Sequence, residues 1–290
     1  MMKMIMLTFV IGIFTLKSSL AQFEYTDIGA RATGLNGAFT SLSDNSLAVF
    51  YNPSGLGQMK FREVSAFYGP SLLGMEELSI AALTYAEPLN FGTVGLGLKT
   101  FGFELYRETN LILSFGNNYG NKIFYGFNFN FYNLNIQNYN SASSFGVDVG
   151  GLAYLTDFLK WGFYAGNISG SKIGASEQRI AQIYRTGLTV QPRNDLNLVM
   201  DIEKDVKYPL SFRAGMEYFI NDFIDLRAGI GTEPVSFTCG ASINYNIFQI
   251  DYSFYNHQDL GITNQGSVTV NFGGNSSRKL AREQLKNAFK

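Results

Sequence analysis

Hydrophobic and polar residues alternate with a period of two along most of the chain from residue 61 onward. In the segment 123–132, every odd position is apolar or aromatic: Ile123, Tyr125, Phe127, Phe129 and Phe131. Gly126, Asn128 and Asn130 lie between them, and segments 210–220 and 235–245 alternate in the same way. Strict alternation over about ten residues predicts a strand with two different faces. About ten residues is also the length that crosses a bilayer as a tilted strand.

The pattern predicts fourteen strands, an even number of the kind that single-chain outer-membrane barrels have. Their ranges are 61–72, 76–87, 91–102, 105–116, 122–137, 143–155, 159–169, 180–191, 195–204, 209–220, 223–232, 235–245, 247–257 and 264–272. The connections after even-numbered strands are mostly short and polar, whereas the longer ones, 170–179 and 258–263, follow odd-numbered strands. Short turns face the periplasm and long loops face outward in bacterial barrels. The even number of strands and the alternation of short and long connections therefore indicate a barrel with both chain ends on the periplasmic side.

A soluble antiparallel sandwich is the alternative, because its strands also alternate. Strands in soluble proteins average only about 5–6 residues. Charged residues make up 16% of the chain and aromatic residues 15%, against about 25% charged residues in a typical soluble domain. Lipid offers no partner to a free sheet edge, so a spanning sheet must close. The sequence therefore predicts an all-β protein, a transmembrane antiparallel outer-membrane β-barrel that spans residues 61–273.

Residues 1–21 have the organisation of a secretory signal peptide. Lys3 provides the positive start, residues 4–16 form an apolar run, and Ser19-Leu20-Ala21 is a small-x-small cleavage site. A retained membrane helix is the alternative, but about 20 apolar residues are needed to span a bilayer. We therefore expect cleavage of the signal peptide and location in the outer membrane of a Gram-negative-type cell.

Residues 22–60 do not alternate and are rich in small side chains. Asn52-Pro53-Ser54-Gly55 is a turn signature, because proline fixes φ and glycine accepts a positive φ. A segment of this kind suits the inside of a barrel, where it can pack against inward glycines: Gly95, Gly97, Gly126 and Gly215. An ordinary periplasmic arm is the alternative. We expect a plug, or hatch, that keeps the lumen closed.

The stretch GARATGLNGAFTSLSDNSLAVFYNPSGLG at 29–57 resembles the N-terminal hatch of FadL-like outer-membrane barrels, and more closely that of the PorV/PorQ branch. The phrases RAGMEY and LRAGIG, within 195–232, also resemble PorV/PorQ strands. The resemblance implies a fourteen-stranded barrel with an N-terminal plug. The residues that match the hatch motif are Arg31, Gly34, Gly37, Asp44, Asn52, Pro53 and Gly55, with Ser54 where the family has alanine.

The resemblance implies two functions that differ between branches. A PorV/PorQ-type barrel is a non-enzymatic accessory component of type IX protein secretion or surface attachment, whose partners are translocon components or cargo proteins. A FadL-like barrel is instead a passive channel for hydrophobic small molecules across the outer membrane. The outer loops predicted here are short, which favours the first function; a purely structural barrel is a third possibility. The net charge of −1 argues against a nucleic-acid partner.

Charged residues on the inward faces cluster late in the chain: Asp201, Glu203, Arg213, Glu217, Asp225, Arg227 and Asp251. The predicted hairpins place Asp201 opposite Arg213 and Glu217 opposite Arg227. Such pairs stabilise a ladder by about 0.2–1 kcal/mol. These charges could line a selective pore, or they could form a network that fills the lumen and holds the plug through Arg31 or Asp44. We favour the network.

Candidate chemistry is sparse. The chain has one cysteine and one histidine, which excludes a disulfide framework and a multi-histidine metal centre. We expect no enzyme activity, no cofactor and no metal, since no G-x-S-x-G elbow surrounds any serine. His257 is expected to be a solvated residue beside an outer loop, and Cys239 falls on the lipid-facing register.

The last residues, 274–290, depart from the usual end of a barrel at a strand. Ser276 or Ser277 could cap a short helix that has Ala281, Leu285, Ala288 and Phe289 on one side. The segment is basic, so it could rest on anionic lipid of the periplasmic leaflet or contact a partner. A frayed, solvated tail is the alternative.

Overall fold

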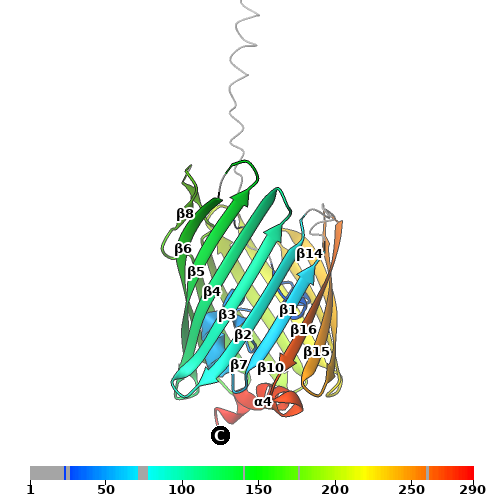
Figure 1. The fold of residues 1–290 in the computed structure, drawn as a ribbon. Helices are drawn as coiled ribbons and strands as arrows, with labels where there is room; N and C mark the ends of the chain where they lie inside the picture. The colour runs from blue at the N-terminus through cyan, green and yellow to red at the C-terminus, as the bar shows by residue number, and fades with distance from the viewer. Residues whose placement is uncertain (1–22, 24–26, 71–77, 140, 176, 259–260) are drawn as a thin grey trace, which may run out of the picture.

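The computed structural model describes residues 23, 27–70, 78–139, 141–175, 177–258 and 261–290, so the expected signal peptide lies outside it. Fourteen antiparallel strands close into one barrel (Figure 1). They are β1 (Glu63–Gly69), β2 (Ile80–Leu89), β3 (Gly92–Gly102), β4 (Tyr106–Tyr119), β5 (Ile123–Ile136), β6 (Ser141–Tyr154), β7 (Leu159–Gly166), β10 (Ile183–Arg193), β11 (Leu196–Asp205), β12 (Leu210–Phe219), β13 (Ile224–Thr232), β14 (Val235–Tyr245), β15 (Phe248–His257) and β16 (Gly261–Asn271). Each strand pairs with its sequence neighbour, and β1 pairs with β16 to close the ring.

The predicted fold class is confirmed, and each predicted strand matches one strand of the barrel. The strand ends differ by a few residues, as at β4, which extends to Tyr119 instead of residue 116, and the longer loops differ as well. The predicted loop 170–179 contains a separate two-stranded sheet, β8 (Lys172–Ile173) with β9 (Gln178–Arg179). These strands have two residues each, too few for a period to be visible. β16 begins at Gly261, so the predicted loop 258–263 is shorter than expected.

The two faces of the wall divide as the alternation predicted. Phe127 is 51% exposed on the outer face, whereas the adjacent Asn128 is 1% exposed on the inner face. The outer face is apolar and aromatic along every strand, and Cys239 is exposed on it. This polarity is the reverse of a soluble sheet and suits a wall surrounded by lipid. Among the residues described, no helix combines the length and the hydropathy that a membrane span requires.

The segment that precedes β1 lies inside the barrel as a hatch. It contains two short helices, α2 (Ala30–Thr33) and α3 (Ala48–Tyr51), and the 3₁₀ helix η1 (Pro53–Gln58). All of residues 28–59 are buried except Asp44, which is partly buried. α2 packs against β14, β15 and β16, whereas η1 packs against β4, β5 and β6. The helices span only four to six residues, which explains why periodicity did not reveal them.

Glycines on the inner wall make room for the hatch, as predicted. A Cβ atom on Gly126 would lie 2.4 Å from the carbonyl carbon of Pro53, and one on Gly95 would lie 2.8 Å from Val49. Gly97 and Gly215 approach the hatch in the same way. The hatch backbone therefore runs directly against the wall at Gly126 and Gly215, whereas hatch side chains fill the space beside Gly95 and Gly97.

The C-terminal residues form a docked helix, α4 (Gly274–Asn287), beneath the short-turn end of the barrel (Figure 1). Its N-cap is Gly273, not Ser276 or Ser277. The Ser277 hydroxyl lies in the first turn and donates to the Gly274 carbonyl (2.8 Å). Leu285 is completely buried in a cluster with Phe124 and Tyr154. The alternative of a frayed, solvated tail is therefore wrong.

We expect Gly126→Ala to destabilise the barrel or to displace the hatch, because the added methyl group meets hatch backbone. Overpacking of this kind costs about 1–3 kcal/mol. The measurement is urea unfolding of the reconstituted protein, followed by the fluorescence of its one tryptophan. Gly151→Ala is the matched control, since a Cβ atom at Gly151 meets nothing within 4 Å. Equal stability of the two variants would show that the hatch does not rest on this wall.

Candidate functional site: the plugged lumen

Arg31 fastens the hatch to the barrel wall. Its Nε donates to Glu217 Oε1 and its Nη2 to Glu217 Oε2, both at 2.8 Å. The same guanidinium pairs with Asp44 within the hatch. Arg31 therefore joins two hatch segments to β12 in one bidentate arrangement. The resemblance named Arg31 and Asp44 as hatch residues, and the structure places them at this junction.

Glu217 extends the same network along the wall. It accepts a hydrogen bond from Arg227 Nε at 2.7 Å, and it lies opposite Arg227 in the ladder as predicted. Arg227 in turn pairs with Asp251 (3.0 Å) and Asp225 (3.5 Å). Glu217 and Arg227 have fully buried side chains. Their charges are compensated by each other and by the hatch, since water does not reach them.

A second set of contacts holds the first part of the hatch. Arg213 pairs with Asp27 of the hatch (2.9 Å) and with Glu203 of β11 (3.0 Å). Asp201 lies opposite Arg213 as predicted, and its Oδ2 accepts hydrogen bonds from the backbone N–H groups of Phe39 and Thr40 at 3.0 and 2.9 Å. Wall carboxylates thus bind the hatch backbone as well as its side chains.

All seven of the predicted inward charges face the lumen, and each of them contacts the hatch, a neighbouring charge or both. This arrangement favours the network interpretation over a selective pore lining. Several charged residues that hold the hatch were missed, among them Asp27, Glu63 and Arg185. Arg185, which pairs with Glu203, occupies an inward position of β10 that alternation could have identified. Glu63 likewise occupies an inward position of β1, where it accepts a hydrogen bond from the Ser46 N–H of the hatch (2.8 Å), whereas Asp27 precedes the hatch helices, outside any periodic pattern.

The remaining motif residues shape the hatch itself. Asn52 caps η1 by accepting from the Ser54 N–H (3.2 Å), and its Nδ2 donates to the carbonyl oxygens of Thr40 (2.8 Å) and Gly151 (3.1 Å). Pro53 follows as the first residue of η1. Asn52 therefore links three parts of the chain.

The glycines of the motif are required by close approach. A Cβ atom on Gly55 would lie 2.0 Å from the Ser43 carbonyl oxygen. Gly37 has a φ of +70°, and a Cβ atom there would meet Asp27 and Arg213. Gly34 lies against the side chain of Arg227. These glycines let the hatch backbone pass beside the charges that hold it.

A cavity of about 80 Å³ lies between the hatch and the wall of β3–β7 and β10; we call it the hatch cavity. The hatch side is apolar: Phe23, Ile28, Val49 and Phe50. The wall contributes apolar and aromatic side chains: Ile112, Tyr132, Tyr164 and Ile183. Polar wall residues complete the lining, among them Lys99, Asn130 and Asp148. The cavity offers an apolar surface with polar groups along one side.

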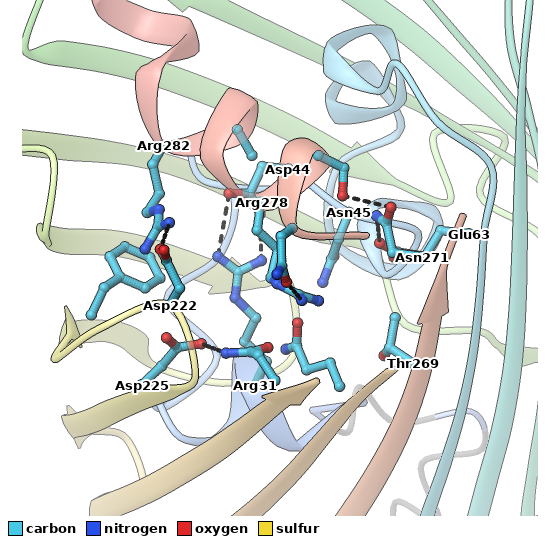
Figure 2. A pocket seen from close by; sticks show the side chains of 16 residues that line it. Arg31, Asp44, Asn45, Glu63, Asp222, Asp225, Thr269, Asn271, Arg278 and Arg282 are labelled. Carbon is cyan, nitrogen blue, oxygen red and sulfur yellow. Dashed lines mark hydrogen bonds and ion pairs between the residues drawn. The ribbon is translucent and has the colours of Figure 1, made fainter. Parts of the chain in front are cut away.

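A second space of about 80 Å³, the basal chamber, lies between the hatch and α4 (Figure 2). Arg31 and Asp44 line it from the hatch, Glu63 and Asp225 from the wall, and Arg278 from α4. At its edge the turn residue Asp222 accepts a hydrogen bond from Arg282, and this bond lowers the pKa of the Asp222 carboxyl. The chamber is therefore polar, unlike the hatch cavity.

The sequence predicts a solvated His257 beside an outer loop, but its side chain is partly buried at the end of the predicted strand. His257 is the last residue of β15 and pairs with Gly261 because β16 begins earlier than predicted. Its ring lies 6.5 Å from that of Tyr255. Within the described parts of the chain, no group of three or more histidine, cysteine or acidic side chains is arranged to hold a metal ion.

We expect Glu217→Gln to cost about 3–5 kcal/mol of unfolding free energy, because it leaves Arg31 and Arg227 buried without their shared counter-charge. Urea unfolding in lipid vesicles measures the change. Glu177→Gln is the control: it removes the exposed pair of Glu177 with Lys172, so we expect no measurable change. A Glu217→Gln protein as stable as the parent would show that the network does not hold the hatch.

No family model matches the sequence, and no curated protein matches it. Among solved structures, the chain is similar to the CymD monoaromatic hydrocarbon channel, with a TM-score of 0.65 and 11% identity over 87% of this chain and 99% of that one. The Pseudomonas putida toluene transporter TodX gives 0.61 and 13% over 86% and 98%. A Pseudomonas aeruginosa FadL homologue gives 0.64 and 12% over 87% and 100%. At these identities the likeness concerns the fold alone, a closed antiparallel barrel of fourteen strands.

Proposed function

We propose that the chain is a passive channel for small hydrophobic molecules across the outer membrane. The hatch cavity carries this proposal, because it brings apolar side chains of the hatch and of the wall together around a space inside the barrel. The names of the similar solved structures, a monoaromatic hydrocarbon channel and a toluene transporter, support the same class of ligand. The activity proposed is binding and release, without a chemical step.

The size of the hatch cavity favours a small ligand. An apolar cavity of about 150 Å³ accepts benzene, and the hatch cavity measures about 80 Å³. A ring-sized molecule therefore enters only if the lining moves slightly. Phe23 and Phe50 are the side chains of the hatch that can make room, because each turns about its own rotatable bonds. The cavity thus selects compact apolar molecules.

A second candidate is the accessory role in type IX secretion or surface attachment that the hatch phrase at 29–57 implies. The observation that favours it is the closed lumen, since a barrel that acts through protein partners needs no open pore. None of the three similar structures described above has a secretion role in its name. Recovery of translocon components or cargo proteins from solubilised outer membranes would support this candidate over the channel.

We expect Ile112→Trp to reduce uptake of labelled toluene about tenfold, a loss that corresponds to roughly 1.4 kcal/mol of binding. Ile112 is 3% exposed and lines the hatch cavity, so the indole fills the space that the ligand needs. The measurement is uptake by cells of a host that lacks a channel of this class. Leu111→Trp is the matched control, because Leu111 is 49% exposed on the lipid-facing side of the same strand.

Uptake by Ile112→Trp that equals uptake by the parent would contradict the proposal. Equal losses in Ile112→Trp and Leu111→Trp would assign the effect to barrel integrity and would also count against the cavity. Heat-modifiable migration in gels shows which variants are folded before uptake is compared.

A further inference from the structure

Helix α4 lies across the short-turn mouth of the barrel and does not hang from one side of it (Figure 1). Near its beginning, Arg278 Nη2 donates to the Asn246 carbonyl in the β14–β15 turn at 2.6 Å. Near its end, Leu285 packs with Phe124 of β5 and Leu152 of β6. In the ring of fourteen strands, β14 and β5 are seven places apart. The helix therefore bridges opposite sides of the mouth.

The helix forms the floor of the basal chamber. Arg31 and Asp44 of the hatch bound the chamber on one side, and Arg278, Ala281 and Arg282 of α4 bound it on the other (Figure 2). Its fourteen residues span about 21 Å at 1.5 Å per residue. Whatever passes between the lumen and the periplasm through this mouth has to pass α4.

Helix α4 is held by an exposed ion pair, by hydrogen bonds with the buried residues Gln58 and Gln191, and by one buried apolar side chain. Arg282 pairs with Asp222, whose side chain is 67% exposed. Gln284 Nε2 donates to the Gln58 carbonyl (3.0 Å), and Gln191 Nε2 donates to the Arg282 carbonyl (2.9 Å). Leu285 is the one large apolar side chain of α4 that is fully buried in the structure as described.

This attachment differs from that of the hatch, which is fixed by buried ion pairs. Exposed ion pairs contribute little to stability, and an element with few buried apolar contacts opens more readily than the strands around it. Gly273 and Gly274 join α4 to β16, and Gly274 has a φ of +54°. Two consecutive glycines provide a connection about which the helix can turn.

We propose that α4 is a lid on the periplasmic mouth, which turns at Gly273–Gly274 and thereby opens the basal chamber to the periplasm. The closed position is the one described here, held by Arg282, Gln284 and the side chain of Leu285. The lid controls access to the chamber whatever the barrel carries. The proposal therefore does not rest on transport of hydrophobic molecules.

The test measures how fast a charged, membrane-impermeant thiol reagent reaches a cysteine in the basal chamber. Thr269→Cys, in a Cys239→Ala background, is the reporter, because Thr269 lines the chamber and is 6% exposed. The unlatched protein adds Arg282→Ala and Gln284→Ala, and we expect labelling about tenfold faster as the lid opens more often. Lys279→Ala with Lys290→Ala is the control: both lysines lie on the exposed side of the C-terminal segment, so labelling should match the parent.

Equal labelling rates in the parent, the unlatched protein and the control would overturn the proposal. It would also be overturned if the cysteine at position 269 of the parent reacted as fast as a cysteine placed at the exposed position Asn287. Hydrogen–deuterium exchange of the unsubstituted protein gives a second measurement. Amides of residues 278–287 should exchange well before those of β5 and β16, and equal protection of helix and strands would also overturn the proposal. Neither measurement uses a hydrophobic ligand, so their failure is distinguishable from failure of the proposed channel.

Discussion

The constraint on which the structure depends is that lipid leaves no backbone group without a protein partner. The sheet must therefore close, and the pairing of β1 with β16 closes it. Fourteen strands enclose a lumen wider than the eight-stranded barrels whose own side chains fill them. The hatch follows from this geometry, because something other than wall side chains has to occupy the space. Inward glycines such as Gly126 and Gly215 then serve the hatch, since they let its backbone reach the wall.

The hatch and the wall are joined differently on the two sides of the lumen. On the side of β11–β15, Arg31 and Arg213 are held by wall carboxylates at 2.8–3.0 Å. A buried ion pair gains little over an apolar contact of the same shape, but breaking one partner away is costly. These pairs therefore determine the position of the hatch in the lumen, and they add little to the free energy of folding. On the side of β3–β7, the hatch meets the wall through apolar side chains such as Val49 and Phe50, through backbone packed against wall glycines, and through hydrogen bonds such as that of Asn52, without ion pairs of this kind among the described residues.

The alternation of residues was sufficient to predict the strands, because side chains point to opposite faces at every step. It also predicted that Glu217 lies opposite Arg227, since a short hairpin turn fixes the register. The bond from Arg31 to Glu217 was beyond this reasoning: the two residues are 186 positions apart and no period relates them. The docking of α4 was missed for the same reason, because Leu285 gains its partners Phe124 and Tyr154 only once the barrel has closed. The hatch cavity likewise exists only between surfaces that meet in three dimensions.

The division of the lumen restricts how a molecule could use it. Moving the hatch away from β12 would break the ion pair between Arg31 and Glu217. Glu217 would then keep only Arg227 as its counter-charge, and such a loss of charge compensation inside the barrel is costly. Widening the hatch cavity at its apolar side chains requires no such step, because these side chains make dispersion contacts that a ligand of similar polarity replaces. The hydrogen bonds that Val49 and Phe23 make with the wall there involve backbone atoms of the hatch. The same asymmetry holds along the axis of the barrel: the hatch is fixed by buried ion pairs, whereas the ion pair of α4 below it is exposed. For the proposed channel, we therefore expect the movement that admits or releases a ligand to be confined to the apolar side of the hatch and to the helix at the mouth, while the charged side holds the hatch in place.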